Sequence, residues 1–240
     1  MESQTDPENK PLILWFNGGP GCSSILGLLS ELGPFRPNPD GETLYEYVFS
    51  WNKMANVLFI DSPRKVGFSY QDEMANNDDQ WNDEKTATDA LNALLDFFTI
   101  FPELTSKEFY IAGESYGGVY VPLLTSYLLQ YMQEHSYALN FKGIMVGNGY
   151  VSQKLNIRSL ADFLYFHGLF GRQEWRELSS KCCQNATDGL PQFQCEYDRF
   201  VEFGDDGDVR PKNVTDDNGC GDLVVKLSWH WIEHTMYATL

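Results

Sequence analysis

The stretch AGESYGG, residues 112–118, indicates which fold this chain adopts. It follows the apolar run at 109–111, which is typical of a buried strand, and it leads into residues 116–135, which are typical of a helix. Ser115 stands between glycines two residues away on each side, in the pattern G-x-S-x-G. This pattern predicts a nucleophile elbow, because a sharp strand-to-helix turn leaves no room for flanking side chains. The alternative is an ordinary glycine-rich turn.

The first 150 residues alternate predicted strands with predicted helices. Strands are predicted at 12–16, 56–61, 108–113 and 141–149, and helices at 83–100 and 116–135. Such alternation predicts an α/β fold with a mostly parallel sheet. After Tyr150 the pattern changes to helices at about 157–168 and 171–181, followed by cysteines and an acidic loop at 202–221. We therefore expect residues 1–151 to form the N-terminal part of a core and residues 152–240 to form a separate, disulfide-stapled layer.

The charge balance excludes several classes of partner. The chain has 17 Lys and Arg residues against 34 Asp and Glu residues, a formal net charge of −17. Because so acidic a surface repels nucleic acid and anionic membranes, we expect neither as a partner. The same acidity suits a protein that works at low pH. No run approaches the roughly 18 apolar residues of a transmembrane helix, and the polar N-terminus does not resemble a signal peptide.

Four of the five cysteines cluster in one segment, whereas Cys22 stands alone. The four are Cys182, Cys183, Cys195 and Cys220. Two glycosylation sequons, which begin at Asn185 and Asn213, interleave with this cluster and favour an oxidising, secretory compartment. The cysteine spacing does not fit a zinc site, and the pair His230 and His234 is more typical of an amphipathic stretch than of a metal site. We expect no metal and no cofactor.

A second glycine-rich turn, NGGPGCSS at 17–24, follows the strand predicted at 12–16. An acyl-transfer site needs two amide donors for the oxyanion. The amide of Tyr116, directly after the nucleophile, is one predicted donor, and the amide of Gly19 is the other. Gly18 and Gly19 would let the backbone approach a reacting carbonyl closely. Without Ser115, this turn would be interpreted only as a tight turn.

Several stretches together resemble the serine carboxypeptidase family. They are LWFNGGPGCSS at 14–24, SWNKMANVLFIDSP at 50–63, FYIAGESYGGVYVP at 109–122 and VGNGYVSQKLNIRSLADFLYFHGLFG at 146–171. Within the family the likeness is to the animal cathepsin A type, and it runs along residues 1–183 and more loosely to 240. It implies an α/β-hydrolase fold with a helical cap inserted after the strand at 141–149. It also implies a lysosomal or secreted hydrolase that releases C-terminal residues from peptides through an acyl-enzyme at acidic pH.

The resemblance also assigns roles to single residues. It implies that Ser115 is the nucleophile and that the amides of Gly19 and Tyr116 form the oxyanion hole. The substrate's C-terminal carboxylate would be bound by Asn17, Gly18, Glu31 and Glu114, with Trp15 nearby. Two buried carboxyl groups that face a substrate carboxylate cannot all be ionised. We therefore expect raised pKa values, so that a protonated Glu31 or Glu114 donates a hydrogen bond to the substrate.

The chain departs from the family pattern in its triad and its cysteines. The resemblance implies the disulfides Cys182–Cys220 and Cys183–Cys195, and it places the partner of Cys22 far downstream. The family order Ser…Asp…His puts the acid and the base in the last third of a longer chain. The four histidines here are His135, His167, His230 and His234, and none matches that position. We therefore expect a fragment or a truncated gene product, inactive by itself because its serine lacks a base.

Two alternatives stay open. One is a non-catalytic protein, either a pseudoenzyme or a protective partner of lysosomal hydrolases. The other is an acyltransferase or esterase on the same scaffold, although the set Asn17, Glu31 and Glu114 favours peptides. The expected partners are a peptide substrate, and a second copy of the chain or other lysosomal hydrolases. A further departure is Arg64-Lys65, where small residues are common in the family.

Overall fold

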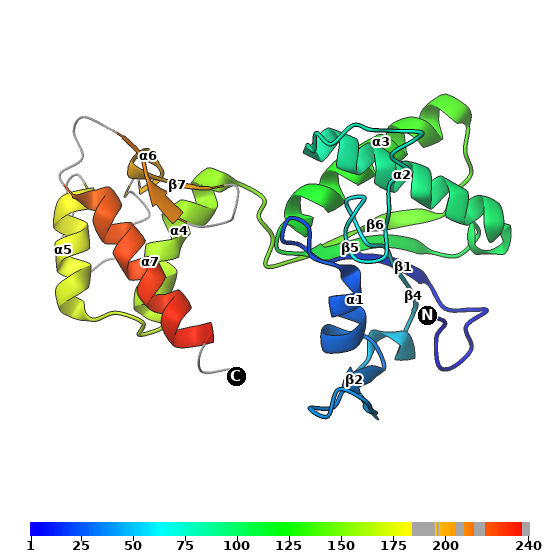
Figure 1. Ribbon diagram of the computed structural model, residues 1–240, viewed down its shortest axis with the longest axis horizontal. Helices are drawn as coiled ribbons and strands as arrows, with labels where there is room; N and C mark the ends of the chain where they lie inside the picture. The colour runs from blue at the N-terminus through cyan, green and yellow to red at the C-terminus, as the bar shows by residue number, and fades with distance from the viewer. Residues whose placement is uncertain (184–194, 196, 205–208, 214–218, 237–240) are drawn as a thin grey trace. The chain divides into compact units, whose positions relative to one another are not determined.

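The computed structural model describes residues 1–183, 195, 197–204, 209–213 and 219–236, and the side chains within α7 only as far as residue 228. The chain divides into two units, Met1–Tyr150 and Val151–Leu240 (Figure 1). This division falls one residue before the boundary expected from the sequence. Among the helices described, none is both long enough and apolar enough to cross a membrane.

Unit 1 is built on a four-stranded parallel sheet, as the alternating pattern predicts. Its strands are β1 (Leu12–Phe16), β4 (Asn56–Phe59), β5 (Phe109–Glu114) and β6 (Phe141–Gly147), in the spatial order β4-β1-β5-β6. The register pairs Trp15 with Ala112 and Phe16 with Gly113. Because parallel strands end at the same edge of a sheet, the turns that follow β1 and β5 lie beside each other. The predicted NGGPG turn and the predicted elbow are these two turns.

Two long helices cover one face of this sheet, as Figure 1 shows. They are α2 (Asp83–Ile100), which the side chain of Asn82 caps at its N-terminus, and α3 (Gly117–His135). Leu14 and Phe16 of β1 pack into their core, whereas Trp15 faces the opposite side and packs near Leu32. This alternation is what a strand buried on both faces requires. Hydrophobic burial therefore holds the sheet edge that carries the two turns.

Short elements cover the other parts of unit 1. They are α1 (Ser24–Leu26), η1 (Gly27–Glu31), the hairpin strands β2 (Phe35–Pro37) and β3 (Leu44–Glu46), η2 (Trp51–Lys53) and η3 (Pro102–Leu104). Of these, α1 and η1 follow the glycine-rich turn directly. They place Glu31 at the end of the second helical turn.

Unit 2 is mainly helical. It holds α4 (Gln153–Phe166), α5 (Arg172–Cys182), α6 (Tyr197–Phe200) and α7 (Cys220–Met236), which pack around one apolar core. The two helices predicted from the sequence are confirmed to within a few residues. The prediction of a plain loop at 202–221 was wrong, because two short antiparallel strands, β7 (Val201–Phe203) and β8 (Val209–Pro211), lie there. Strands of three residues are too short to show an alternating pattern.

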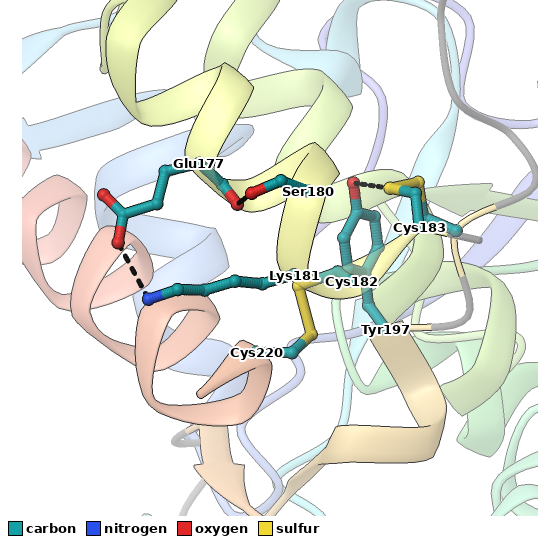
Figure 2. Close-up of a disulfide and its surroundings, with 8 residues drawn as sticks. Glu177, Ser180, Lys181, Cys182, Cys183, Tyr197 and Cys220 are labelled. Atoms are coloured by element: carbon teal, nitrogen blue, oxygen red, sulfur yellow. Dashed lines mark hydrogen bonds and ion pairs between the residues drawn. A yellow bond between two sulfur atoms is a disulfide. The ribbon is translucent and has the colours of Figure 1, made fainter. Parts of the chain in front are cut away.

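Two disulfides staple unit 2, with the pairing that the family resemblance implies. Cys182 at the end of α5 joins Cys220 at the start of α7, with Cα atoms 5.1 Å apart (Figure 2). Cys183 joins Cys195, with Cα atoms 4.5 Å apart, and the Cys183 sulfur lies 3.9 Å from the Tyr197 hydroxyl. Of the two predicted glycosylation sites, Asn213 is exposed just after β8, and Asn185 lies outside the described residues.

Candidate active site

Ser115 lies at the junction of β5 and α3 with a strained backbone. Its φ of +54° is in the left-handed region that residues other than glycine seldom adopt. Three backbone hydrogen bonds hold it there: its amide donates to the Gly147 carbonyl at 3.1 Å, and its carbonyl accepts from Tyr150 at 2.7 Å and Gly118 at 3.0 Å. The side chain is exposed. Strain that the surroundings hold in place is typical of a functional residue.

The turn after β1 packs directly against this elbow. A Cβ atom added at Gly18 would lie 2.7 Å from the Ser115 Cβ and 2.6 Å from the Tyr116 amide nitrogen. Gly19 follows with φ of +112° and is exposed. The two turns can approach so closely only because position 18 has no side chain. The structure thus brings the backbone segments of both predicted oxyanion donors, Gly19 and Tyr116, next to Ser115.

Asn17 is the centre of the predicted carboxylate site, and it is 4% exposed. Its side-chain oxygen accepts hydrogen bonds from the Trp15 indole at 2.9 Å and the Gly27 amide at 3.1 Å. These two donors establish which end of the amide is oxygen. The side-chain nitrogen donates to both oxygens of Glu31 at 3.2 Å and to Glu114 at 3.0 Å. Residues 97 positions apart in the chain therefore meet in one network.

The two carboxyl groups of this network share a hydrogen bond. Burial, the neighbouring Glu31 carboxylate and the hydrogen bond to Glu31 raise the pKa of Glu114, and the hydrogen bond from Asn17 opposes this in part. Glu114 therefore keeps its proton at a higher pH than an isolated glutamate does. Both hydrogens of the Asn17 amide are already engaged. The carboxyl proton is accordingly a donor that this site can offer to an anionic ligand.

Asp61 supports the glycine-rich turn, and the sequence analysis missed it. Its side chain accepts from the Ser23 hydroxyl at 2.6 Å, the Ser24 amide at 2.7 Å and the Phe68 amide at 2.8 Å. Asp61 lies two residues after the end of β4, at the same sheet edge as the two turns. Its position after a buried strand is the signal that could have identified it.

The side chain of Tyr116 makes several contacts that hold this residue in place, and these contacts were not predicted from the sequence. Its hydroxyl lies 3.0 and 3.2 Å from the two oxygens of Asp83. Its ring stacks on Tyr150, with centroids 5.9 Å apart, and meets Tyr120 edge-on at 5.2 Å. Burial first, and then the Asp83 hydrogen bond and charge, raise the pKa of Tyr116 to about 12. The phenol therefore stays protonated and acts as a donor at physiological pH.

Within unit 1, His135 lies at the C-terminal end of α3, whereas Ser115 lies just before its N-terminal end. His167 belongs to unit 2, and each of the two rings contacts a backbone carbonyl of its own helix. His230 and His234 fall within α7, beyond the last side chain that the structure describes there. Cys22 has a free and exposed thiol. Among the described residues, no cluster of His, Cys, Asp and Glu side chains could hold a metal ion.

Comparisons with known proteins show the family to which this chain belongs. The serine carboxypeptidase family model matches residues 1–226. The mouse lysosomal protective protein is 46% identical over 183 residues, which cover 76% of this chain and 37% of that protein. The Arabidopsis thaliana serine carboxypeptidase-like 26 is 45% identical over 212 residues, which cover 87% of this chain and 45% of that protein. This chain thus spans less than half the length of these relatives.

A solved structure supports the fold. The chain is similar to the crystal structure of Kex1(delta)p, a prohormone-processing carboxypeptidase from Saccharomyces cerevisiae, with a TM-score of 0.65 and 32% identity. The match covers 72% of this chain and 38% of that one. The parallel sheet, the elbow and the disulfide-stapled helical unit are those of an α/β-hydrolase fold with a helical insertion. This chain belongs to the serine carboxypeptidase family.

Proposed function

We propose that this chain carries the nucleophile and the carboxylate-recognition site of a serine-type carboxypeptidase. The supporting observation is that the Asn17–Glu31–Glu114 network lies directly beside the Ser115 elbow: Glu114 precedes Ser115, and Asn17 precedes Gly18 in the turn that packs on it. A site for a terminal carboxylate next to a nucleophile selects the last peptide bond of a substrate. An esterase or acyltransferase would not need a carboxyl pair at this place.

The reaction follows from these positions. The Ser115 hydroxyl attacks the carbonyl of the last peptide bond, and the oxyanion is stabilised by the amides of Gly19 and Tyr116. The C-terminal amino acid leaves as the acyl-enzyme forms, and water then hydrolyses the ester. The proton of Ser115 needs a base. The family resemblance places this base, a histidine with its aspartate, in the part of the relatives that this chain does not span.

Recognition of the substrate should depend on pH. At acidic pH Glu114 is protonated and donates a hydrogen bond to the substrate carboxylate. As pH rises through the raised pKa of Glu114, this side chain becomes negatively charged and repels that carboxylate. We therefore expect peptidase activity to be highest at acidic pH. The loss on the alkaline side should appear mainly as a higher KM for substrates with a free C-terminal carboxylate.

The Glu114→Gln variant tests this proposal in the protein that carries this chain. The measurement is the pH profile of kcat/KM for a blocked dipeptide with a free carboxylate and for the same dipeptide amidated. We expect Glu114→Gln to flatten the alkaline loss for the free carboxylate and to leave the amide profile unchanged. Glu103→Gln, an exposed glutamate of η3, is the matched control. An unaltered profile in Glu114→Gln would contradict the proposed recognition.

A non-catalytic role is the second candidate, because the histidine described in unit 1, His135, lies at the end of α3 that is farther from Ser115. A fluorophosphonate probe separates the two, since it labels an activated serine and not an unactivated one. Labelling that Ser115→Ala abolishes would support the peptidase. If the wild-type protein, with Ser115 present, is not labelled by the probe at any pH, the result would favour a pseudoenzyme or a binding partner.

We further propose a lysosomal or secreted location. The two disulfides favour an oxidising compartment, and the mouse relative is named a lysosomal protective protein. Association with a second copy or with other lysosomal hydrolases stays a prediction. Size-exclusion chromatography with light scattering would test for a homodimer.

A further inference from the structure

The first turn of α2 contacts the elbow through a single side chain. Asp83, the first residue of α2, accepts the hydrogen bond of the Tyr116 hydroxyl. Tyr116 is the residue directly after Ser115, and its amide is the proposed oxyanion donor. A hydrogen bond to an ionised acceptor is roughly twice as strong as one between neutral groups. Asp83 thus makes a strong contact with a side chain whose own backbone belongs to the reaction site.

The Tyr116 ring is held on its faces and edge as well as at its hydroxyl. Tyr150 stacks on it with an interplanar angle of 14°, and Tyr120 meets it edge-on. Tyr150 also donates its amide to the Ser115 carbonyl. The ring therefore lies within the group of residues that keeps Ser115 in its strained conformation. Any shift of the Tyr116 ring would be transmitted to this turn through the backbone shared by Ser115 and Tyr116.

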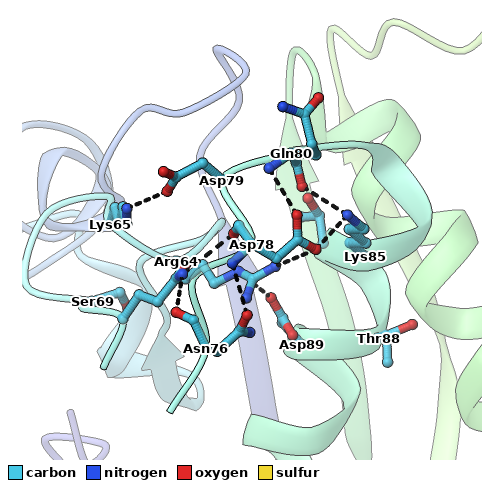
Figure 3. A network of polar contacts seen from close by, with 12 residues as sticks. Arg64, Lys65, Ser69, Asn76, Asp78, Asp79, Gln80, Lys85, Thr88 and Asp89 are labelled. Atoms are coloured by element: carbon cyan, nitrogen blue, oxygen red, sulfur yellow. Dashed lines mark hydrogen bonds and ion pairs between the residues drawn. The ribbon is translucent and has the colours of Figure 1, made fainter. Parts of the chain in front are cut away.

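The segment that carries Asp83 is anchored on both sides (Figure 3). Before it, Asp78 binds Lys85 at 2.5 Å and lies 4.0 Å from Arg64. After it, Asp89 pairs with Arg64 at 3.2 Å. The Arg64 guanidinium also lies over the Trp81 ring, 4.7 Å from its centroid. Arg64 thus contacts residues on both sides of Asp83 in sequence, and the Asn82 side chain caps the same turn.

We infer that Asp83 is a positioning residue: by holding the Tyr116 phenol, it keeps the Tyr116 amide in the orientation that receives the oxyanion. This inference rests on the proposed function. The Tyr116 amide must lie where the oxyanion forms in the transition state, and not where the carbonyl oxygen of the bound substrate lies. A small displacement of this amide therefore destabilises the transition state more than it weakens substrate binding. Arg64, which replaces a small residue common in the family, supports this arrangement by anchoring the segment around Asp83.

Kinetics of the protein that carries this chain test the inference. Asp83→Asn should lower kcat roughly tenfold with little change in KM, because misplacement of a reacting group costs rate and not binding. Asn keeps a neutral acceptor, so Asp83→Asn removes the charge of the acceptor, whereas Tyr116→Phe removes the donor without changing the helix terminus and should lower kcat at least as much. The double variant should be no worse than Tyr116→Phe alone, because both changes act on the same hydrogen bond. Asp83→Glu, which keeps a carboxylate acceptor, should retain more of kcat than Asp83→Asn.

Asp96→Asn is the matched control, an exposed aspartate farther along α2. It should leave kcat and KM at wild-type values. Amide hydrogen exchange gives a second readout that does not need activity. Asp83→Asn should reduce protection of the Ser115 and Tyr150 amides, whose hydrogen bonds hold the elbow, and Asp96→Asn should not.

The outcomes separate this inference from the proposed function. Wild-type kcat in both Asp83→Asn and Tyr116→Phe would overturn the positioning role, as would equal losses in kcat and in the binding of a substrate analogue. Failure of the proposed function would look different, because Ser115→Ala would then leave hydrolysis unchanged. If the proposed function fails, a loss of amide protection in Asp83→Asn would still show that Asp83 holds the elbow. Unchanged amide protection in that variant would overturn the positioning role of Asp83.

Discussion

The two units of this chain hold a carboxyl group of raised pKa in different ways. In unit 1, the partly buried Glu114 lies among partners: Asn17 donates to it and Glu31 shares a hydrogen bond with it. In unit 2, Asp162 of α4 is 6% exposed, and neither of its oxygens has a hydrogen-bond partner among the residues that the structure describes. Burial raises the pKa of both groups. A buried carboxyl group without hydrogen-bond partners should lower the stability of its unit when it ionises.

The units also differ in what holds them together. Unit 1 has a sheet with apolar side chains on both faces and, among its described residues, no disulfide. Unit 2 packs helices around one apolar core and adds two disulfides. A small core supplies little stability by itself, so covalent links compensate. Variants in each unit should therefore affect different properties.

Loss of the Cys182–Cys220 disulfide should have the largest effect, and it should be confined to unit 2. The bond closes a loop of 38 residues, so the paired change to serine should cost about 3–4 kcal/mol. Thermal unfolding followed by hydrogen exchange would show whether unit 1 keeps its protection. Cys22→Ser removes a free thiol and should change neither unit. Equal destabilisation of both units would contradict their independence.

Gly18→Ala should act on unit 1 through its site. The added Cβ would lie 2.7 Å from the Ser115 Cβ, too close for any real contact, so one of the two turns must move. We expect kcat to fall roughly a hundredfold, since displacement of about 1 Å has this effect. Gly143→Ala in β6 is the control, because a Cβ there meets no atom within 4 Å. Comparable kcat in the two variants would show that the close approach is not needed.

Asp162→Asn should have the smallest effect and should depend on pH. A raised pKa in the folded state means that folding favours the protonated form. Wild-type stability is therefore highest at low pH and falls as pH rises from the ordinary aspartate value towards the raised one. Asn cannot ionise, so the variant should lose this pH dependence, and its stability relative to wild type should increase as pH rises. Denaturant unfolding at several pH values measures this, with the exposed Asp222→Asn as control.

Local patterns predicted the four strands of the parallel sheet and the two long helices of unit 1. The apolar runs and the 3–4 residue spacing place β1, β5, α2 and α3 within one or two residues of their observed bounds. The short strands were missed in both units: β2 and β3 in unit 1, and β7 and β8 in unit 2. Strands of three residues are defined by the partner that they pair with, and no local pattern encodes that partner. Sequence periodicity therefore predicts long helices and strands better than short ones.

Single acidic residues illustrate the limit for the site. Asp61 and Asp83 are two among 34 acidic residues. The position of Asp61 after a buried strand places it at the sheet edge but does not show which amides it binds, and nothing in the local sequence links Asp83 to Tyr116. Glu31, judged only by its neighbours, would be a surface residue at the end of a helix. The structure places it within hydrogen-bond distance of Asn17. Family likeness, and not local pattern, was what identified it in advance.

The sequence by itself determined the strand–turn–helix at Ser115 and the glycines that allow the turn, because backbone conformation and strand periodicity are local properties. The tertiary structure decided which side chains meet there. Parallel strands bring Asn17 and Glu114 to one edge although 97 residues separate them, and the packing of α2 brings Asp83 to Tyr116. Such contacts depend on the order and register of strands. That order is set by burial summed over the whole unit and not by any one segment.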